Sequence, residues 1–320
     1  MKTYGWLGLL LLLLSEYCLF RRIEPFASWF YCFAWWSYIL LADNLLLRLR
    51  GNSLLSGRRA ELLRMLPLSV VVWLLFEACN LALRNWAYDG VPALAWIRWP
   101  GYSLAFATVL PGVFLTADLV ECILFGVRER PFASESEKLL APPPTSPSLA
   151  FTLLGAGLSF APLIWPRYFF PAVWLGPIFL FDPLLERLGL QSLSLRIAAG
   201  DRRRIWSLLI GGCACGLMWE FWNFWAASRW MYSIPYFGTW KVFEMPLLGF
   251  LGFPPFALEC WILYHFLDRL RARWQSRPAQ AAFWAATALF CILVFRAIDH
   301  HSVVRFVIDM QWRTTAWLFV

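Results

Sequence analysis

The chain has 320 residues, of which 60% are hydrophobic and only 15% are charged. A soluble globular domain has about 45–50% apolar and about 25% charged residues, so this composition argues against an ordinary soluble protein. The net charge of +8 does not predict a nucleic-acid partner, because the arginines lie between long apolar runs, as they do in membrane proteins.

The apolar runs predict nine transmembrane helices. A helix needs about 20 apolar residues to cross a bilayer core of about 30 Å, and continuous rather than alternating runs favour helices over a barrel. The first run follows Met1 like a signal peptide, but no small-residue cleavage site follows it, so we expect a retained helix. The predicted spans are 4–20, 25–47, 65–84, 101–125, 149–165, 168–188, 205–228, 246–268 and 281–297.

The last residues of the chain, 298–320, are apolar but contain Asp299, Arg305, Asp309 and Arg313. A tenth span, a re-entrant segment and an interfacial helix all agree with this pattern. The sequence leaves the three alternatives open.

Lys and Arg are concentrated in the loops that follow the second, fourth, sixth and eighth spans. The positive-inside rule places these loops and the N-terminus in the cytoplasm, in a protein integral to the bacterial inner membrane. Residues 127–148 contain several prolines in succession, which cannot continue a helix. We therefore expect a cytoplasmic Pro/Ser-rich linker there, between residues 1–126 and 149–268, with a C-terminal extension over 269–320.

The two halves contain the same rare polar residues in the same order. Chance similarity between apolar segments would not bring these residues into register. We therefore expect two parallel repeats of four helices each, an arrangement known in transporters, although duplication alone does not prove transport. The aligned pairs are Asp43 with Asp182, Gly57 with Gly200, Arg59 with Arg202, Glu77 with Glu220, Asn80 with Asn223, Trp86-Ala87-Tyr88 with Trp230-Met231-Tyr232, Pro92 with Pro235, and Glu121-Cys122 with Glu259-Cys260.

Glu77, Glu121, Glu220 and Glu259 all lie inside predicted spans, where an ionisable residue costs at least about 2.5–3.5 kcal/mol. Asn80 follows Glu77 by three residues, and Asn223 follows Glu220 in the same way, so each pair shares a helical face. We expect one acidic centre at the interface between the repeats, in which some carboxyls are protonated or paired with cations. Its candidate residues are Glu77, Asn80, Glu121, Glu220, Asn223 and Glu259.

Three interpretations of these acids compete. In the first, they are protonated and form structural hydrogen bonds between helices. In the second, they are general acids that act on a lipid-soluble substrate, because a buried carboxylic acid can hold and donate a proton at neutral pH. In the third, they bind a cation or a proton during a transport cycle.

Aromatic residues are abundant, with 21 Trp, 28 Phe and 10 Tyr. At span ends such residues are typical of an interfacial belt, which suffices for Trp86, Tyr88, Trp230 and Tyr232. Rings beside a buried acid can also hold an apolar substrate or stabilise a carbocation. The candidate substrate-binding residues are Trp219, Trp222, Trp230 and Tyr232, with simple packing as the alternative.

Other signals of chemistry are few. The sequence contains no P-loop, GxGxxG, HExxH or nucleophile-elbow motif, and it indicates no particular cofactor. Its eight cysteines lie in apolar runs without CxxC spacing and form no pattern with the three histidines, so no metal site is predicted. Residues 243–256 contain three prolines and two glycines, which predict a broken helix that is buried or lines a cavity.

The order of these motifs resembles the small membrane lycopene cyclase domains of carotenoid synthesis. The resemblance rests on an acid, a Trp-x-Tyr segment, and then a proline followed by an intramembrane glutamate. In the second half these residues are Glu220, Trp230-Met231-Tyr232, Pro255 and Glu259; in the first half Pro111 precedes Glu121. It implies short helical units that act in pairs, with paired acidic sites facing a hydrophobic substrate.

The sequence therefore predicts an all-α, polytopic transmembrane bundle that acts as an enzyme on an isoprenoid or another lipid-soluble substrate. A transporter or channel-like protein that uses the same acids is the first alternative, and a structural membrane subunit is the second. The predicted partners are the lipid bilayer and a hydrophobic small molecule. The oligomeric state is not predicted.

Overall fold

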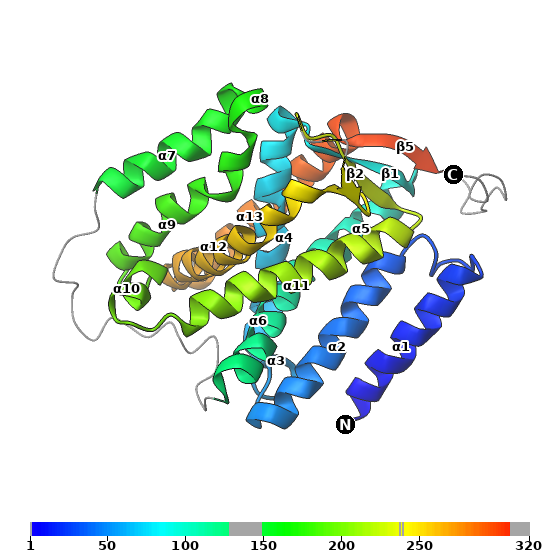
Figure 1. The fold of residues 1–320 in the computed structure, drawn as a ribbon, viewed down its shortest axis with the longest axis horizontal. Helices are drawn as coiled ribbons and strands as arrows, with labels where there is room; N and C mark the ends of the chain where they lie inside the picture. The colour runs from blue at the N-terminus through cyan, green and yellow to red at the C-terminus, as the bar shows by residue number, and fades with distance from the viewer. Residues whose placement is uncertain (1, 128–148, 237, 239, 308–320) are drawn as a thin grey trace.

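The structure is a computed structural model that describes residues 2–127, 149–236, 238 and 240–307 (Figure 1). It is mostly helical, which confirms the predicted helical class. The elements up to residue 127 are α1 (Thr3–Phe20), α2 (Phe30–Arg50), α3 (Leu54–Gly57), α4 (Arg59–Leu83), β1 (Trp86–Pro92), α5 (Ala95–Phe106) and α6 (Val109–Phe125). Those from residue 149 are α7 (Leu149–Ile164), α8 (Pro166–Phe169), η1 (Phe170–Trp174), α9 (Gly176–Arg187), α10 (Leu193–Ala198), α11 (Arg203–Trp225), β2 (Arg229–Tyr232), β3 (Lys241–Val242), β4 (Met245–Pro246), η2 (Leu247–Gly252), α12 (Phe253–Arg273), α13 (Arg277–His301) and β5 (Val303–Val307).

Seven helical segments of the described chain are long and apolar enough to cross a membrane. An eighth results if Pro166–Trp174 and Gly176–Arg187, which meet at 41°, form one span. These segments identify a membrane protein, although the count differs from the nine spans expected. The difference arises because α7 has only 16 residues, fewer than the roughly 20 that a bilayer requires, and the segment after it is broken.

Close helix packing depends on small residues. A Cβ added at Gly155 of α7 would lie 2.2 Å from the backbone nitrogen of Leu180 in α9. At Gly211 of α11 it would lie 2.9 Å from the Cα of Ala117 in α6. Such residues let helix backbones approach within a membrane, where van der Waals packing rather than the hydrophobic effect holds helices together.

Three short strands form a sheet that the sequence analysis did not anticipate. Their order is β2-β1-β5, with β2 antiparallel and β5 parallel to β1. Trp86 is opposite Tyr232 and Tyr88 is opposite Trp230, so the two Trp-x-Tyr segments pair with each other. Aromatic side chains suit a strand, and the pairing satisfies backbone groups that follow two helix ends.

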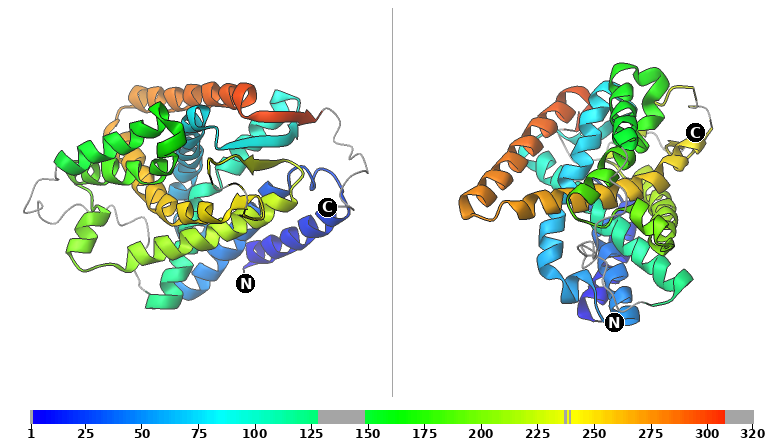
Figure 2. Two further views of the ribbon diagram at one scale, coloured as in Figure 1. Left: turned by 45° about the horizontal axis from the view of Figure 1, so that its top comes forward. Right: turned by 90° about the vertical axis from the view of Figure 1, so that its left-hand side faces the viewer.

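The C-terminal extension completes this sheet. Helix α13 lies along the outside of the bundle and leads into β5 (Figure 2). Two ion pairs fasten the extension: Arg98 to Asp299 at 2.6 Å, and Arg305 to Asp89 at 2.7 Å. Of the predicted tail, residues 298–301 end α13 and residues 303–307 form β5, a strand that the sequence analysis did not predict; residues 308–320 lie outside the described residues, so the three alternatives for the whole tail remain predictions.

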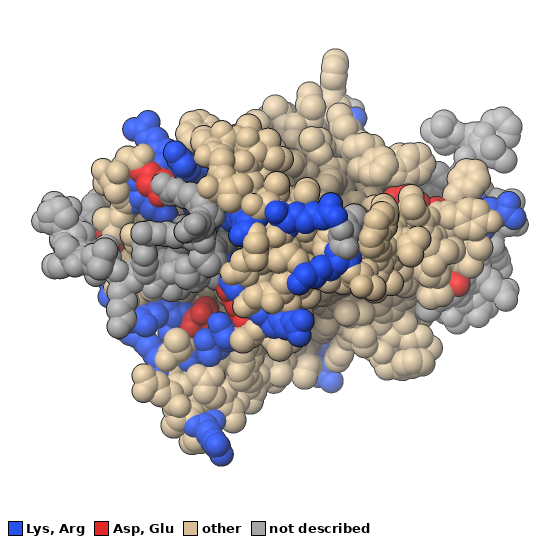
Figure 3. Space-filling model, turned by 90° about the horizontal axis from the view of Figure 1, so that it is seen from below, with Lys and Arg blue, Asp and Glu red and all other residues tan. Residues whose placement is uncertain are grey.

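Two of the predicted cytoplasmic loops, those that contain α3 and α10, lie away from the sheet. In Figure 1 the sheet is at the upper right, whereas α3 and α10 lie toward the lower and left sides. Seen from below, Lys and Arg side chains gather on this face with few acids between them (Figure 3). Most of the predicted linker, residues 128–148, lies outside the described residues.

Candidate functional site

Asn80 and Asn223 each anchor the strand that follows their own helix. The Asn80 side chain donates from Nδ2 to the carbonyl oxygen of Trp86 at 2.9 Å, and its Oδ1 accepts from the backbone nitrogen of Asn85 at 2.8 Å. Asn223 makes the corresponding pair of bonds to the backbone of Trp230, both at 2.9 Å. The asparagine of each Glu-x-x-Asn motif therefore ties a helix end to a strand, and its side-chain amide is engaged by backbone groups.

Replacing Asn80 with leucine is expected to lower the free energy of unfolding by about 2 kcal/mol, because buried backbone groups of the following turn lose their partner. Titration with a denaturing detergent, followed by tryptophan fluorescence, measures this change. Ala82→Leu on the exposed face of the same helix is the control. Equal stability of the two variants would contradict the anchoring role.

Glu77 and Glu220 are fully buried and face the tyrosines of these strands. Oε1 of Glu77 accepts from Trp73 at 2.9 Å, from Trp86 at 3.0 Å and from the Tyr88 hydroxyl at 2.5 Å. Oε1 of Glu220 accepts from the Tyr232 hydroxyl at 2.8 Å. In the described part of the chain the second oxygen of each carboxyl group has no hydrogen-bond partner.

The two tyrosines stay protonated over the physiological range. Burial raises the pKa of Tyr88 and of Tyr232, and the adjacent glutamate in each case raises the pKa further. Each hydroxyl therefore donates to its glutamate. The result is a Tyr–Glu pair in each half, held at the sheet end of α4 and α11.

Glu121 belongs to a different cluster. It lies near the far end of α6, where its Oε2 is 2.9 Å from Arg204, and Asp118 is 3.0 Å from Arg50 and 3.2 Å from Arg204. The expected single acidic centre is therefore not formed. Helix α4 runs toward β1, so Glu77 near its end lies at the sheet. After β1 the chain continues through α5 and α6 away from the sheet, so Glu121 near the end of α6 lies at the other side.

Glu259 is fully buried in α12, and neither of its carboxylate oxygens has a hydrogen-bond partner among the described residues. No hydrogen bond between described residues joins it to Glu77 or Glu220. It therefore remains a separate buried acid.

Three cavities that share wall residues lie beside the Tyr–Glu pairs. We name this set the aromatic channel and its members, in the order of their shared walls, the inner, middle and outer compartments. The inner compartment, of about 90 Å³, shares Trp73, Trp219 and Trp230 with a middle one of about 40 Å³. The middle compartment in turn shares Trp86, Trp174, Tyr232, Met245, Gly249 and Gly252 with an outer one of about 280 Å³. The walls are predominantly aromatic and aliphatic, as ligand pockets usually are.

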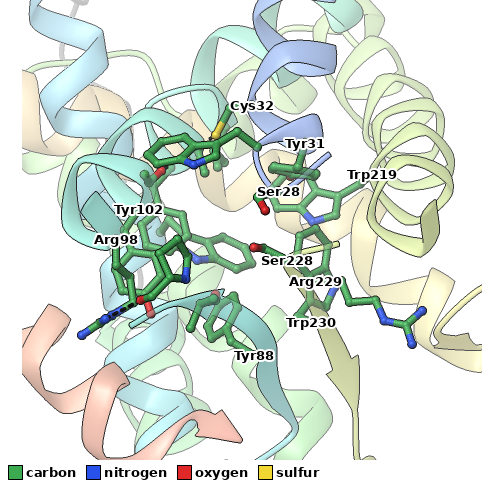
Figure 4. Close-up of a pocket in the computed structure, with 18 residues that line it drawn as sticks. Ser28, Tyr31, Cys32, Tyr88, Arg98, Tyr102, Trp219, Ser228, Arg229 and Trp230 are labelled. Carbon is green, nitrogen blue, oxygen red and sulfur yellow. Dashed lines mark hydrogen bonds between the residues drawn. The ribbon is translucent and has the colours of Figure 1, made fainter. Parts of the chain in front are cut away.

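The inner compartment lies between residues of both halves (Figure 4). Tyr31, Trp219 and Trp230 line one side and Tyr102 lies opposite, while Arg229 projects away from the cavity. Tyr88 forms part of the wall, so the hydroxyl that binds Glu77 comes from a lining residue. Tyr232 has the same relation to the middle and outer compartments.

Three of the four proposed substrate-binding residues line the channel: Trp219, Trp230 and Tyr232. Trp222 does not line these compartments; it packs edge-on against Trp35, with ring centroids 5.1 Å apart. The residues missed from the sequence are Tyr31, Trp73, Asn85, Tyr102, Trp174 and Phe256. The segment 243–256, where a broken helix was expected, does line the channel, through β4 and η2. Its proline and glycine content was the sequence signal that pointed to this part of the channel wall.

The described residues contain no group of three or more His, Cys, Asp or Glu side chains that could hold a metal ion. Comparison of the chain with protein-family models, curated proteins and solved structures gave no match. The interpretation of the site therefore rests on its geometry.

Proposed function

We propose that this membrane protein binds a lipid-soluble ligand of isoprenoid type in the aromatic channel and acts on it through the Tyr–Glu pairs. The observation that carries the proposal is the series of aromatic compartments whose walls include Tyr88 and Tyr232, each bonded to a buried glutamate. An elongated apolar molecule suits such a space, because its burial removes apolar surface from water without leaving polar groups unpaired.

In the proposed reaction Glu220 starts as a neutral carboxylic acid. Tyr232 at the wall gives its hydroxyl proton to the ligand and takes the Glu220 proton in its place, which leaves Glu220 as the carboxylate. A proton delivered to a double bond leaves a carbocation on the ligand, which the rings of Trp219 and Trp230 on the wall stabilise. Loss of a proton from a neighbouring carbon then forms the shifted double bond, and that proton returns through Tyr232 to the Glu220 carboxylate. General acids of this kind contribute about 10²–10⁴-fold to a rate.

We further propose that the two halves arose by duplication. Two matched details support this origin. Asp43 accepts from the Leu55 backbone nitrogen at 3.0 Å, and Asp182 accepts from that of Ser194 at 3.0 Å, so each aspartate holds the start of a short helix. The antiparallel register pairs Ala87 with Met231, as a local twofold axis between the halves requires. We also propose that the N-terminus lies in the cytoplasm, as the distribution of Lys and Arg predicts.

A transporter is the second candidate, and the buried, unpartnered Glu259 favours it, because such an acid can bind and release a proton. Ligand binding alone does not separate the two candidates. Chemical conversion does, since a transporter returns its ligand unchanged.

Filling the channel at Gly252 tests the proposal. A Cβ added there would lie 3.4 Å from the Trp174 ring, in ordinary contact, and the rest of a leucine side chain would occupy the middle and outer compartments. With retinol, an isoprenoid alcohol that quenches tryptophan fluorescence, as the probe, Gly252→Leu in lipid nanodiscs is expected to bind about tenfold more weakly than wild type.

Gly157→Leu on α7 is the matched control, because a Cβ there meets nothing within 4 Å. It should bind retinol like the wild type. Saturable quenching that is the same in both variants, or absent from the wild type, would exclude ligand binding in the aromatic channel.

A further inference from the structure

The outer compartment contains one polar side chain that the fold does not use. Asn85 lines this compartment and is only 4% exposed. Its Oδ1 has no hydrogen-bond partner in the described structure. Its backbone atoms are satisfied separately: its nitrogen donates to Asn80 at 2.8 Å, and its carbonyl oxygen accepts from Ser233 at 2.8 Å.

The corresponding position in the second half shows that the turn does not require an asparagine. Arg229 precedes Trp230 as Asn85 precedes Trp86, and Arg229 forms an ion pair with Glu244 at 3.1 Å. The two halves therefore use different side chains before the same strand. Asn85 lines the outer compartment and is almost fully enclosed, whereas the Arg229 side chain projects away from the inner compartment.

The surroundings offer Asn85 no partner of their own. Its neighbours on the wall include Trp86, Phe170 and Met245, and the one nearby hydroxyl, on Tyr232, already donates to Glu220. A buried amide without a partner is unfavourable, and a ligand group that bonds to it removes that cost. A hydroxyl group fits best, because it can donate to the amide oxygen or accept from the amide nitrogen, whichever way the amide is turned.

The position of Asn85 also orients the ligand. Leu175, Leu248 and Leu251 line the outer compartment and are 43%, 50% and 69% exposed, so the compartment reaches the protein surface at apolar side chains. A charged head group would be costly to bury there without a partner of opposite charge. An uncharged hydroxyl end at Asn85 leaves the apolar chain to extend inward past Trp86 and Trp174.

We propose that Asn85 is the head-group subsite for a long-chain alcohol whose hydroxyl end lies in the outer compartment. This inference rests on the proposed binding of a lipid-soluble ligand in the aromatic channel. It adds the chemical class of that ligand and its direction in the channel.

Two probes that differ only at the hydroxyl group test this proposal: retinol and retinyl methyl ether. Quenching of tryptophan fluorescence in nanodiscs should show that the wild type prefers retinol by about tenfold, the effect of one hydrogen bond to an otherwise unpaired group. Asn85→Ala should lose the preference while binding the ether as the wild type does. Asn85→Thr, which retains a hydroxyl group, should recover part of it.

The ratio of the two affinities is the decisive measurement, because general loosening of the channel would weaken both probes together. If the wild type binds both probes equally, the head-group subsite is excluded while ligand binding in the channel stands. Retention of the preference by both Asn85 variants excludes the subsite as well. If neither probe binds to the wild type, the proposed function itself fails.

Discussion

Arg204→Met is expected to lower the free energy of unfolding by about 3–5 kcal/mol, the usual effect of removing one partner from a buried ion pair. Arg204 is 3% exposed and contacts both Asp118 and Glu121, which lie on another helix. Without it, two buried carboxylates would share the single charge of Arg50. Methionine keeps much of the side-chain volume, so the loss would come from the charge.

Detergent-denaturant titration of the purified protein measures this effect. Arg203→Met is the matched control, because Arg203 is the adjacent residue, is exposed, and its side chain makes one hydrogen bond within the described residues, at 3.4 Å to the carbonyl oxygen of Phe125. The control should change stability by less than about 1 kcal/mol. Equal losses in the two variants would show that the cluster contributes no more than surface charge.

Glu220→Gln is expected to reduce conversion of the ligand at least about a hundredfold, the lower end of general-acid contributions, while leaving the protein folded. Glutamine has the size of glutamate and keeps an oxygen that accepts the hydrogen bond from Tyr232. It cannot supply a proton to replace the one that Tyr232 gives up. A purely structural acid should therefore tolerate the change, whereas a catalytic one should not.

Lipid and pigment profiles of cells that express the wild type, Glu220→Gln or Glu77→Gln would measure conversion. Binding of retinol by each purified variant reports whether its channel is intact. Full conversion by both variants would exclude chemistry at either Tyr–Glu pair. If the wild type also leaves every lipid unchanged while it binds retinol, the transporter becomes the better explanation.

The sequence predicted best those structural features that depend on one segment of the chain alone, such as a long helix or a break in one. A run of apolar residues must satisfy its backbone hydrogen bonds internally in a membrane, so length and composition alone predicted most of the long helices. The same reasoning overestimated α7, whose 16 residues are apolar but too few. The breaks at 243–256 followed from proline and glycine chemistry, which is also local.

The pairing of elements was harder to predict. Each Trp-x-Tyr segment suits a membrane interface as well as a strand, and only the presence of the other segment decides between them. Register between strands depends on two distant parts of the chain coming together. For the same reason the strand at Val303–Val307 was missed, since its partner β1 lies more than two hundred residues earlier.

The sequence by itself determined that this is a helical membrane protein, that its rare polar residues recur in order, and that Glu77 and Glu220 are buried. Only the tertiary structure decided which partner each acid has: a tyrosine for these two, arginines for Glu121, and none among the described residues for Glu259. The physical reason is that burial follows from the hydrophobicity of one helix, whereas a hydrogen-bond partner depends on the direction and rotation of its neighbours. The aromatic channel is likewise a product of packing, because Trp73, Trp174 and Trp219 come from three separate elements and meet only in the folded chain.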